Sequence, residues 1–169
     1  MKYFKENYEV NIFSNFELIK YVFYKMHKKG GKIFIMSSLA GMLPLIMLEG
    51  YTSTKAAISI ITTSIRKELK MIRSKVQISL IEPGAYYTGF NQVMIDNKEN
   101  TLNKDGIFYK YRNLFTKKQN KLFKLMERKN INTIVNKIVK QAHKKKTKFK
   151  IRVPLSQVII VKLYFIMFR

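Results

Sequence analysis

The sequence predicts an α/β fold in which a parallel sheet is covered by helices on both faces. Two long segments, 8–26 and 51–73, carry apolar residues at helical spacing, and each is followed by a short apolar run of the kind that forms a buried strand. Because helix and strand alternate along the chain, the strands should lie parallel in one sheet.

The first predicted helix, 8–26, ends at the sequence Lys28-Lys29-Gly30-Gly31. The first strand, 32–36, follows this glycine turn and precedes a serine-containing loop. The second helix, 51–73, contains no glycine or proline. The second strand, 76–81, is β-branched and is closed by Pro83-Gly84.

Beyond residue 88 the pattern weakens. Residues 88–120 are polar and predict a short helix or two inside a mobile loop, 131–143 predicts a third amphipathic helix, and 149–153 a third strand. From 158 to 168 every residue but Lys162 is apolar. We therefore expect a partial α/β domain over 1–153 with about three strands, followed by an apolar tail over 154–169.

The chain is strongly basic, with a formal net charge of +23. Lysine far outnumbers arginine, and isoleucine, asparagine, phenylalanine and tyrosine are abundant, as AT-rich codons would produce. A surface selected for nucleic acid uses arginine more often, so we favour a solvated surface and no nucleic acid partner. There is no cysteine and no apolar leader, which makes a cytoplasmic location the default expectation.

Tyr51 and Lys55 lie four residues apart on the second predicted helix, so an ammonium can sit beside a phenol. That proximity would lower the pKa of the tyrosine toward a range useful for proton transfer. The spacing alone is weak evidence, because Tyr21/Lys25 and Tyr24/Lys28 share it. These other two are interpreted as surface pairs.

Position distinguishes Tyr51/Lys55 from the other pairs. Ser38 stands thirteen residues earlier at the end of a predicted buried strand, and Pro83-Gly84 ends the next strand, with Thr88 shortly after it. The carboxyl edge of a parallel sheet is where open α/β sheets bind their ligands. These residues should therefore converge on one crevice.

Three consecutive segments resemble motifs of the short-chain dehydrogenase/reductase family. They are Gly31-Lys32-Ile33-Phe34-Ile35-Met36-Ser37-Ser38-Leu39-Ala40-Gly41, Tyr51-Thr52-Ser53-Thr54-Lys55-Ala56-Ala57 and Ile81-Glu82-Pro83-Gly84-Ala85-Tyr86-Tyr87-Thr88. Val10-Asn11-Ile12 resembles the helix motif that supplies the family's catalytic asparagine. The resemblance covers about residues 7–90 and implies a partial, three-layer Rossmann-like fold.

The resemblance implies an NAD(P)-dependent oxidoreductase that transfers hydride between the nicotinamide and a carbonyl or secondary alcohol. Tyr51 would be the general acid or base, and Ser38 would hydrogen-bond the reacting oxygen. Lys55 would lower the tyrosine pKa and bind the nicotinamide ribose, while Asn11 would hold a water that links Lys55 to solvent.

By the same resemblance, Pro83, Gly84 and Thr88 would contact the nicotinamide side of the cofactor. The seven glycines form no Gly-x-x-x-Gly-x-Gly turn after a strand, so the family's pyrophosphate cradle is absent from these 169 residues. The residue that selects NAD or NADP is not readable either.

This absence leaves an alternative to catalysis. The chain would then be a truncated, inactive remnant, or an interaction fragment that dimerises with a full-length relative. The resemblance implies that helices 8–26 and 51–73 form the contact of such a homo- or hetero-oligomer.

Two interpretations remain open for residues 144–169, where a lysine-rich run precedes the apolar tail. One is a peripheral membrane contact, since the tail is shorter than the about 20 residues needed to span. The other, which we favour, is an element that packs over the cleft and gives an apolar substrate its wall. His27 and His143 lack ligand-spaced partners, so no metal site is expected.

Overall fold

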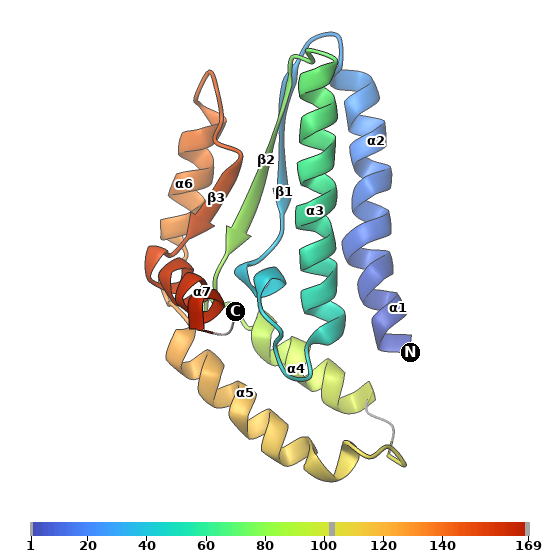
Figure 1. Ribbon diagram of the computed structural model, residues 1–169, viewed down its shortest axis with the longest axis vertical. Coiled ribbons are helices and arrows are strands. Elements are labelled where there is room, and N and C mark those ends of the chain that lie inside the picture. The colour runs from blue at the N-terminus through green and yellow to red at the C-terminus, as the bar shows by residue number, and fades with distance from the viewer. Residues whose placement is uncertain (1, 102–103, 168–169) are drawn as a thin grey trace.

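The centre of the molecule is a parallel sheet of three strands in the order β1-β2-β3. The structure is a computed structural model that describes residues 2–101 and 104–167. The strands are β1 (Gly31–Met36), β2 (Val76–Pro83) and β3 (Lys150–Val153), all pointing the same way (Figure 1). Leu80 and Ile81 of the central strand are at most 2% exposed. The predicted parallel sheet is confirmed.

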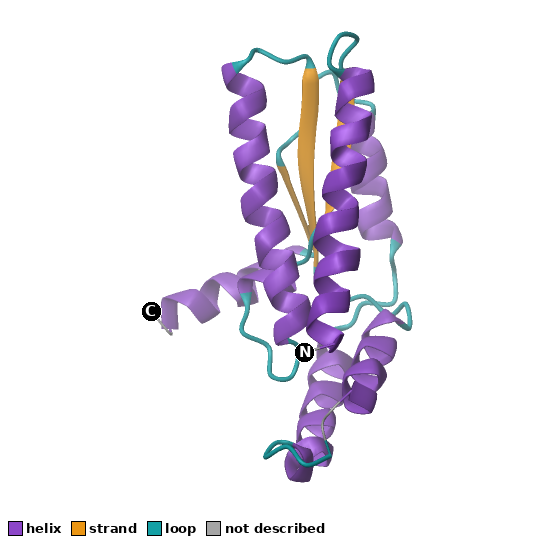
Figure 2. Ribbon diagram, turned by 90° about the vertical axis from the view of Figure 1, so that its right-hand side faces the viewer, coloured by secondary structure: helices purple, strands orange, loops and turns teal. Residues whose placement is uncertain are grey.

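One face of the sheet is covered by two long helices that run side by side (Figure 2). The first combines α1 (Lys2–Tyr8), a π-helical turn (Glu9–Phe13) and α2 (Ser14–Met26), and so begins six residues earlier than the sequence predicted. The second is α3 (Glu49–Met71). Ile12, Ile58 and Leu80 belong to the apolar cluster between these helices and the sheet.

The opposite face is covered by α6 (Asn132–Ala142), close to the predicted range. Its Ile134 packs with Ile81 of β2 and Ile151 of β3 in a second buried cluster. Helices on both faces of a parallel sheet make the three-layer arrangement that the alternating sequence pattern predicted.

The region predicted as a mobile loop with a short helix or two contains longer helices. They are α4 (Phe90–Thr101) and α5 (Arg112–Met126), joined through a short 3₁₀ turn at Tyr109–Tyr111. Both lie at the end of the molecule toward which the strands point (Figure 1). They therefore stand next to the carboxyl edge of the sheet.

The apolar tail forms α7 (Leu155–Met167), and residues 168–169 of the predicted tail lie outside the described part of the chain. Val158 and Val161 of α7 pack against Leu39, in the loop that follows β1. The lysine run 144–146 instead lies before β3, at the opposite end of that strand. No helix among the described residues is long and apolar enough to cross a membrane.

Candidate active site

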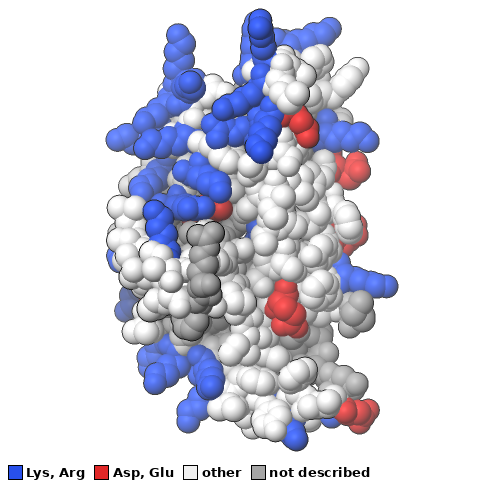
Figure 3. All heavy atoms as spheres, viewed as in Figure 1, with Lys and Arg blue, Asp and Glu red and all other residues white. Residues whose placement is uncertain are grey.

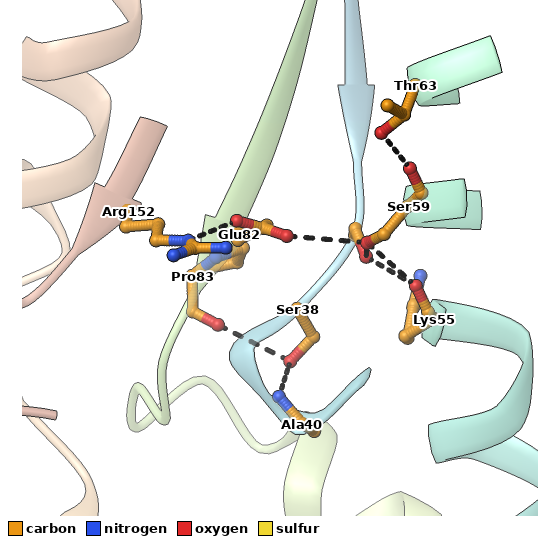
Figure 4. Close-up of polar contacts among 9 residues, drawn as sticks. Ser38, Ala40, Lys55, Ser59, Thr63, Glu82, Pro83 and Arg152 are labelled. Carbon is orange, nitrogen blue, oxygen red and sulfur yellow. Dashed lines mark hydrogen bonds and ion pairs between the residues drawn. The ribbon is translucent and has the colours of Figure 1, made fainter. Parts of the chain in front are cut away.

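The carboxyl ends of β1 and β2 and the first turns of α3 meet at one place. Ser38 follows β1, Pro83 ends β2, and Tyr51 and Lys55 lie in the first two turns of α3. Figure 4 shows Ser38, Pro83 and Lys55 in this arrangement.

Ser38 is almost buried and has a fixed set of partners. Its Oγ donates to the carbonyl oxygen of Pro83 at 3.3 Å and accepts from the amide of Ala40 at 3.0 Å, which caps the short 3₁₀ helix Leu39–Met42. Ser38 also lowers the pKa of the neighbouring Tyr51 phenol. A hydroxyl has one proton, so Ser38 can give it to Pro83 or turn it toward a phenolate.

Tyr51 has a raised pKa. Burial of the phenol raises it above its usual 10.0, the hydrogen bond with Ser38 opposes the shift, and nearby Tyr3 adds to it. The expectation that the neighbouring ammonium lowers this pKa overall is therefore wrong: removal of the phenolate from water outweighs the favourable contacts. The ring centroid of Phe90 lies 5.7 Å from that of Tyr51, a contact that was not predicted from the sequence.

Lys55 lies against the ring of Tyr51, with its Nζ 5.6 Å from the ring centroid. The same Nζ donates to the carbonyl oxygen of Met36, at the end of β1, at 3.4 Å. Burial lowers the pKa of Lys55 below its usual 10.5. The two pKa values therefore shift in opposite directions, because burial disfavours the charged form of each side chain.

Asn11 lies on the π-helical turn and reaches α3 one residue before Lys55. Its Nδ2 donates to Thr54 Oγ1 at 3.2 Å, and Thr54 Oγ1 donates to the carbonyl oxygen of Tyr51 at 2.7 Å. Such π turns are frequent at functional sites. Asn11 is thus held beside the helix that carries Tyr51, and the water relay remains a prediction.

Gly84 and Thr88 lie on the segment that leaves β2. A side chain at Gly84 would collide with Gln157 of α7, whose amide oxygen would lie 1.9 Å from the added Cβ. Gln157 also accepts from the amide of Ala85 at 2.7 Å. Thr88 is exposed and precedes Gly89. The structure gathers Ser38, Tyr51, Lys55 and Pro83, and Gly84 follows Pro83 directly. The role of Thr88 stays a prediction.

Sequence reasoning missed a buried acid directly behind the site. Glu82 is 1% exposed and is paired with Arg152 Nε from β3. Ser59 Oγ lies 3.4 Å from Glu82 Oε1 and also 3.0 Å from the carbonyl oxygen of Lys55 (Figure 4). The signal was present, because an acid inside an apolar strand must have a buried partner.

Ser37 completes this link. Its Oγ donates to the carbonyl oxygen of Lys55 at 2.8 Å and lies 2.9 Å from Ser59 Oγ. The hydroxyls of Ser37, just after β1, and of Ser59 on α3 therefore converge on the backbone carbonyl of Lys55, and Ser59 links that carbonyl to the Glu82 carboxylate of β2. This cluster fixes α3 against the strand ends that carry Ser38 and Pro83.

Gly41 lets the loop after β1 lie directly on α3. A Cβ at this position would come within 2.7 Å of the amide nitrogen of Ala56, so no other residue fits. Beyond this contact, a shallow, open pocket of about 580 Å³ lies between residues 41–47 and the part of α3 that carries Thr52 and Ala56. Tyr51 and Lys55 are not among the residues that line it.

The profile of the short chain dehydrogenase family matches residues 1–99, which is more than half of this chain. The chain therefore belongs to the short-chain dehydrogenase family, as the three ordered motifs implied. Two solved members have the same fold. One from Streptomyces avermitilis gives a TM-score of 0.67 at 16% identity and covers 98% of this chain and 58% of that one. Another, from Burkholderia phymatum in complex with NAD, gives a TM-score of 0.58 at 17% identity. This match covers 80% of this chain and 47% of that one.

Curated relatives are oxidoreductases. The chain is 30% identical over 112 residues to the uncharacterized oxidoreductase YusZ of Bacillus subtilis, and 33% identical over 88 residues to estradiol 17-beta-dehydrogenase 2 of Mus musculus. These alignments cover 66% and 52% of this chain. They span only 39% and 23% of the relatives' own lengths.

Proposed function

We propose that this chain carries the catalytic portion of an NAD- or NADP-dependent oxidoreductase that interconverts a carbonyl and a secondary alcohol. The observation that carries the proposal is that the centroid of the Tyr51 ring lies 5.6 Å from the Lys55 ammonium and that Ser38 acts on the same phenol. The proposal rests on this placement together with family membership.

Tyr51 is the proposed general acid and base. Its raised pKa keeps the phenol protonated at neutral pH, so in the reductive direction it can protonate the carbonyl oxygen. As the phenolate forms, the Ser38 hydroxyl can turn its proton from the Pro83 carbonyl to the phenolate or to the substrate oxygen. Ser38 would thus stabilise whichever oxygen bears the negative charge.

The residues present fit the nicotinamide end of a dinucleotide. The Lys55 ammonium and the Tyr51 hydroxyl supply donors for ribose hydroxyls, and Pro83 and Gly84 border the same space. When bound, the cofactor donates or accepts the hydride. The pyrophosphate of the dinucleotide finds no such fit within these 169 residues, because they contain no Gly-x-x-x-Gly-x-Gly turn to bind it.

The substrate is proposed to be a small carbonyl or alcohol with an apolar part. Leu39 follows Ser38 and packs with Val158 and Val161 of α7, and Phe90 contacts the Tyr51 ring. Apolar groups on two sides of the phenol would suit an apolar substituent next to the reacting carbon.

A second candidate is a non-catalytic partner of a full-length relative. Exposed apolar side chains on the two long helices favour it, among them Phe13 and Ile60, which are 56% and 68% exposed. In this case α1–α2 and α3 would contact the relative.

Fluorescence titration with NADH and NADPH separates the two candidates. We expect saturable binding of a dinucleotide, and we expect Lys55→Met to weaken it. Tyr51→Phe should leave the binding in place but lower turnover by about 10²–10⁴-fold. A chain that binds neither dinucleotide, yet copurifies with a full-length family member, would instead establish the non-catalytic candidate.

A further inference from the structure

The amino ends of the three strands form a second distinctive surface, remote from the candidate active site. Each strand is entered through a turn that bears exposed basic residues. We call these residues the basic end: Lys28, Lys29, Arg73, Lys75, Lys144, Lys145 and Lys146. Figure 3 shows Lys and Arg side chains gathered where α2 and α3 turn into the sheet.

Specific contacts hold the three turns together. Gly30 of the first turn lies against Lys75 of the second, where an added Cβ would come 3.0 Å from the Lys75 Cβ. Gln77 Nε2 donates to the carbonyl oxygen of Lys145 at 2.8 Å, and Lys32 Nζ donates to that of Ala142 at 2.6 Å. The basic residues therefore stand on one packed edge and not on independent loops.

Among the described residues, no acidic side chain forms an ion pair with the basic end. In the described part of the chain, the ion pairs join Lys2 to Glu6 and Arg152 to Glu82, both away from this edge. Codon bias accounts for lysine in place of arginine, but it does not account for lysines on all three turns of one edge. Such a concentration of positive charge attracts a polyanionic surface.

Two apolar side chains project from the same edge. Met71 and Ile72, at the end of α3, are 82% and 66% exposed and directly precede Arg73. Apolar residues amid lysines suit the boundary between lipid head groups and acyl chains, whereas they gain nothing against a phosphodiester backbone. Six of the seven basic residues are lysine, which lacks the planar fork that favours nucleic acid.

We propose that the basic end docks this protein on an anionic lipid surface, with Met71 and Ile72 inserted at the boundary. This surface differs from the membrane contact over 144–169 that the sequence left open, because the 144–146 run lies with the other two turns and not with the apolar helix α7. The proposal does not depend on the catalytic one.

The test is cosedimentation of the purified chain with phosphatidylcholine–phosphatidylserine vesicles, compared with pure phosphatidylcholine vesicles. The variant replaces five lysines of the basic end by glutamine: Lys28, Lys29, Lys144, Lys145 and Lys146. The matched control makes the same change at five exposed lysines in and after α5, with the same change in net charge: Lys117, Lys118, Lys121, Lys124 and Lys129. Circular dichroism confirms that both remain folded.

We expect the basic-end variant to lose at least about tenfold in binding to phosphatidylserine vesicles and the control to lose little. Equal losses would reduce the effect to overall charge and overturn the proposal. The double variant Met71→Ser/Ile72→Ser should also weaken vesicle binding without changing binding to single-stranded RNA. If it leaves vesicle binding unchanged while RNA binds more tightly than vesicles, the partner is a nucleic acid and the proposal fails.

Discussion

At the scale of single residues, the site combines a phenol whose pKa is raised with an amine whose pKa is lowered. Burial is the main cause of both shifts, for Tyr51 and for Lys55. Lys55 therefore loses its charge at a lower pH than an exposed lysine does, and Tyr51 stays a neutral phenol to a higher pH than an exposed tyrosine does. The neutral phenol persists across the physiological range, which suits proton donation to a carbonyl.

The lowered pKa of Lys55 predicts the pH dependence of carbonyl reduction. The value of kcat/KM should be flat near neutrality and fall along an alkaline limb that lies below 10.5, as Lys55 deprotonates. Lys55→Arg should move that limb upward in whatever activity remains, because a guanidinium keeps its charge. A limb at the same pH in both proteins would show that another group controls it.

The same shift predicts a stabilising substitution. Because the folded-state pKa of Lys55 is lowered, its favourable contribution is present above the unfolded value of 10.5 and is lost as pH falls through the folded value. At pH 7 the burial cost is therefore present, and Lys55→Met should raise Tm while weakening cofactor binding. The gain should shrink at alkaline pH.

Thermal unfolding at several pH values measures this effect. The exposed Lys137→Met on α6 is the matched control and should leave Tm nearly unchanged. A fall in Tm for Lys55→Met at pH 7 would mean that the contacts of the ammonium with Met36 and Tyr51 outweigh its burial.

At the scale of elements, the Glu82–Arg152 pair joins β2 to β3 directly behind the site. The Glu82 side chain is 2% exposed and that of Arg152 24%. Arg152→Met should cost about 3–5 kcal/mol, because it leaves a buried carboxylate without its cation. The double variant Glu82→Met/Arg152→Met should recover most of that loss.

Urea unfolding of the two single variants and the double variant measures this coupling. Additive losses would mean that the two side chains act independently, contrary to the contact in the structure. Because Ser59 links Glu82 to the backbone near Lys55, the single variants should also weaken cofactor binding more than the double variant does.

The sequence predicted the regular elements better than their connections. Apolar periodicity identified β1, β2, α3 and α6 within a few residues, because their buried faces dominate their composition. The start of the first helix was missed since residues 2–7 contain no fully buried side chain, and only Tyr3 and Phe4 are apolar there. The π turn at Glu9–Phe13 has no sequence signature, although it holds Asn11 beside α3.

The site was predictable only in part. Ser38, Tyr51, Lys55 and Pro83 follow from strand ends and motif order, so their convergence could be expected. Pairs of side chains that are far apart in the sequence could not be predicted, because sequence spacing does not show which strand lies beside β2. Arg152, seventy residues from Glu82, is such a case. Phe90 on α4 and Gln157 on α7 likewise contact the site. The polar segment 88–120 and the apolar tail did not predict how these helices pack.

At the scale of the whole molecule, the two long helices present a broad exposed apolar surface. Its members include Val10, Phe13, Leu18, Tyr21 and Ile60, each more than half exposed. Surfaces of this kind mark interfaces, which agrees with the proposed oligomer through these helices.

Light scattering coupled to gel filtration tests that oligomer. We expect a dimer that Ile60→Asp converts to a monomer, since a carboxylate at a buried interface is costly. Ile107→Asp, at a residue that is 78% exposed outside these helices, should leave the dimer intact. A wild-type chain that is monomeric at high concentration would exclude self-association by this surface.

The length of β2 separates the basic end from the candidate active site. Eight residues of extended chain span about 26 Å, so a molecule resting on its basic end would hold Tyr51 well clear of the lipid head groups. The mouth of the site would face the aqueous phase. Substrate would therefore arrive by diffusion through water and not by lateral exchange from the bilayer, which limits it to compounds with appreciable aqueous solubility even if one part is apolar.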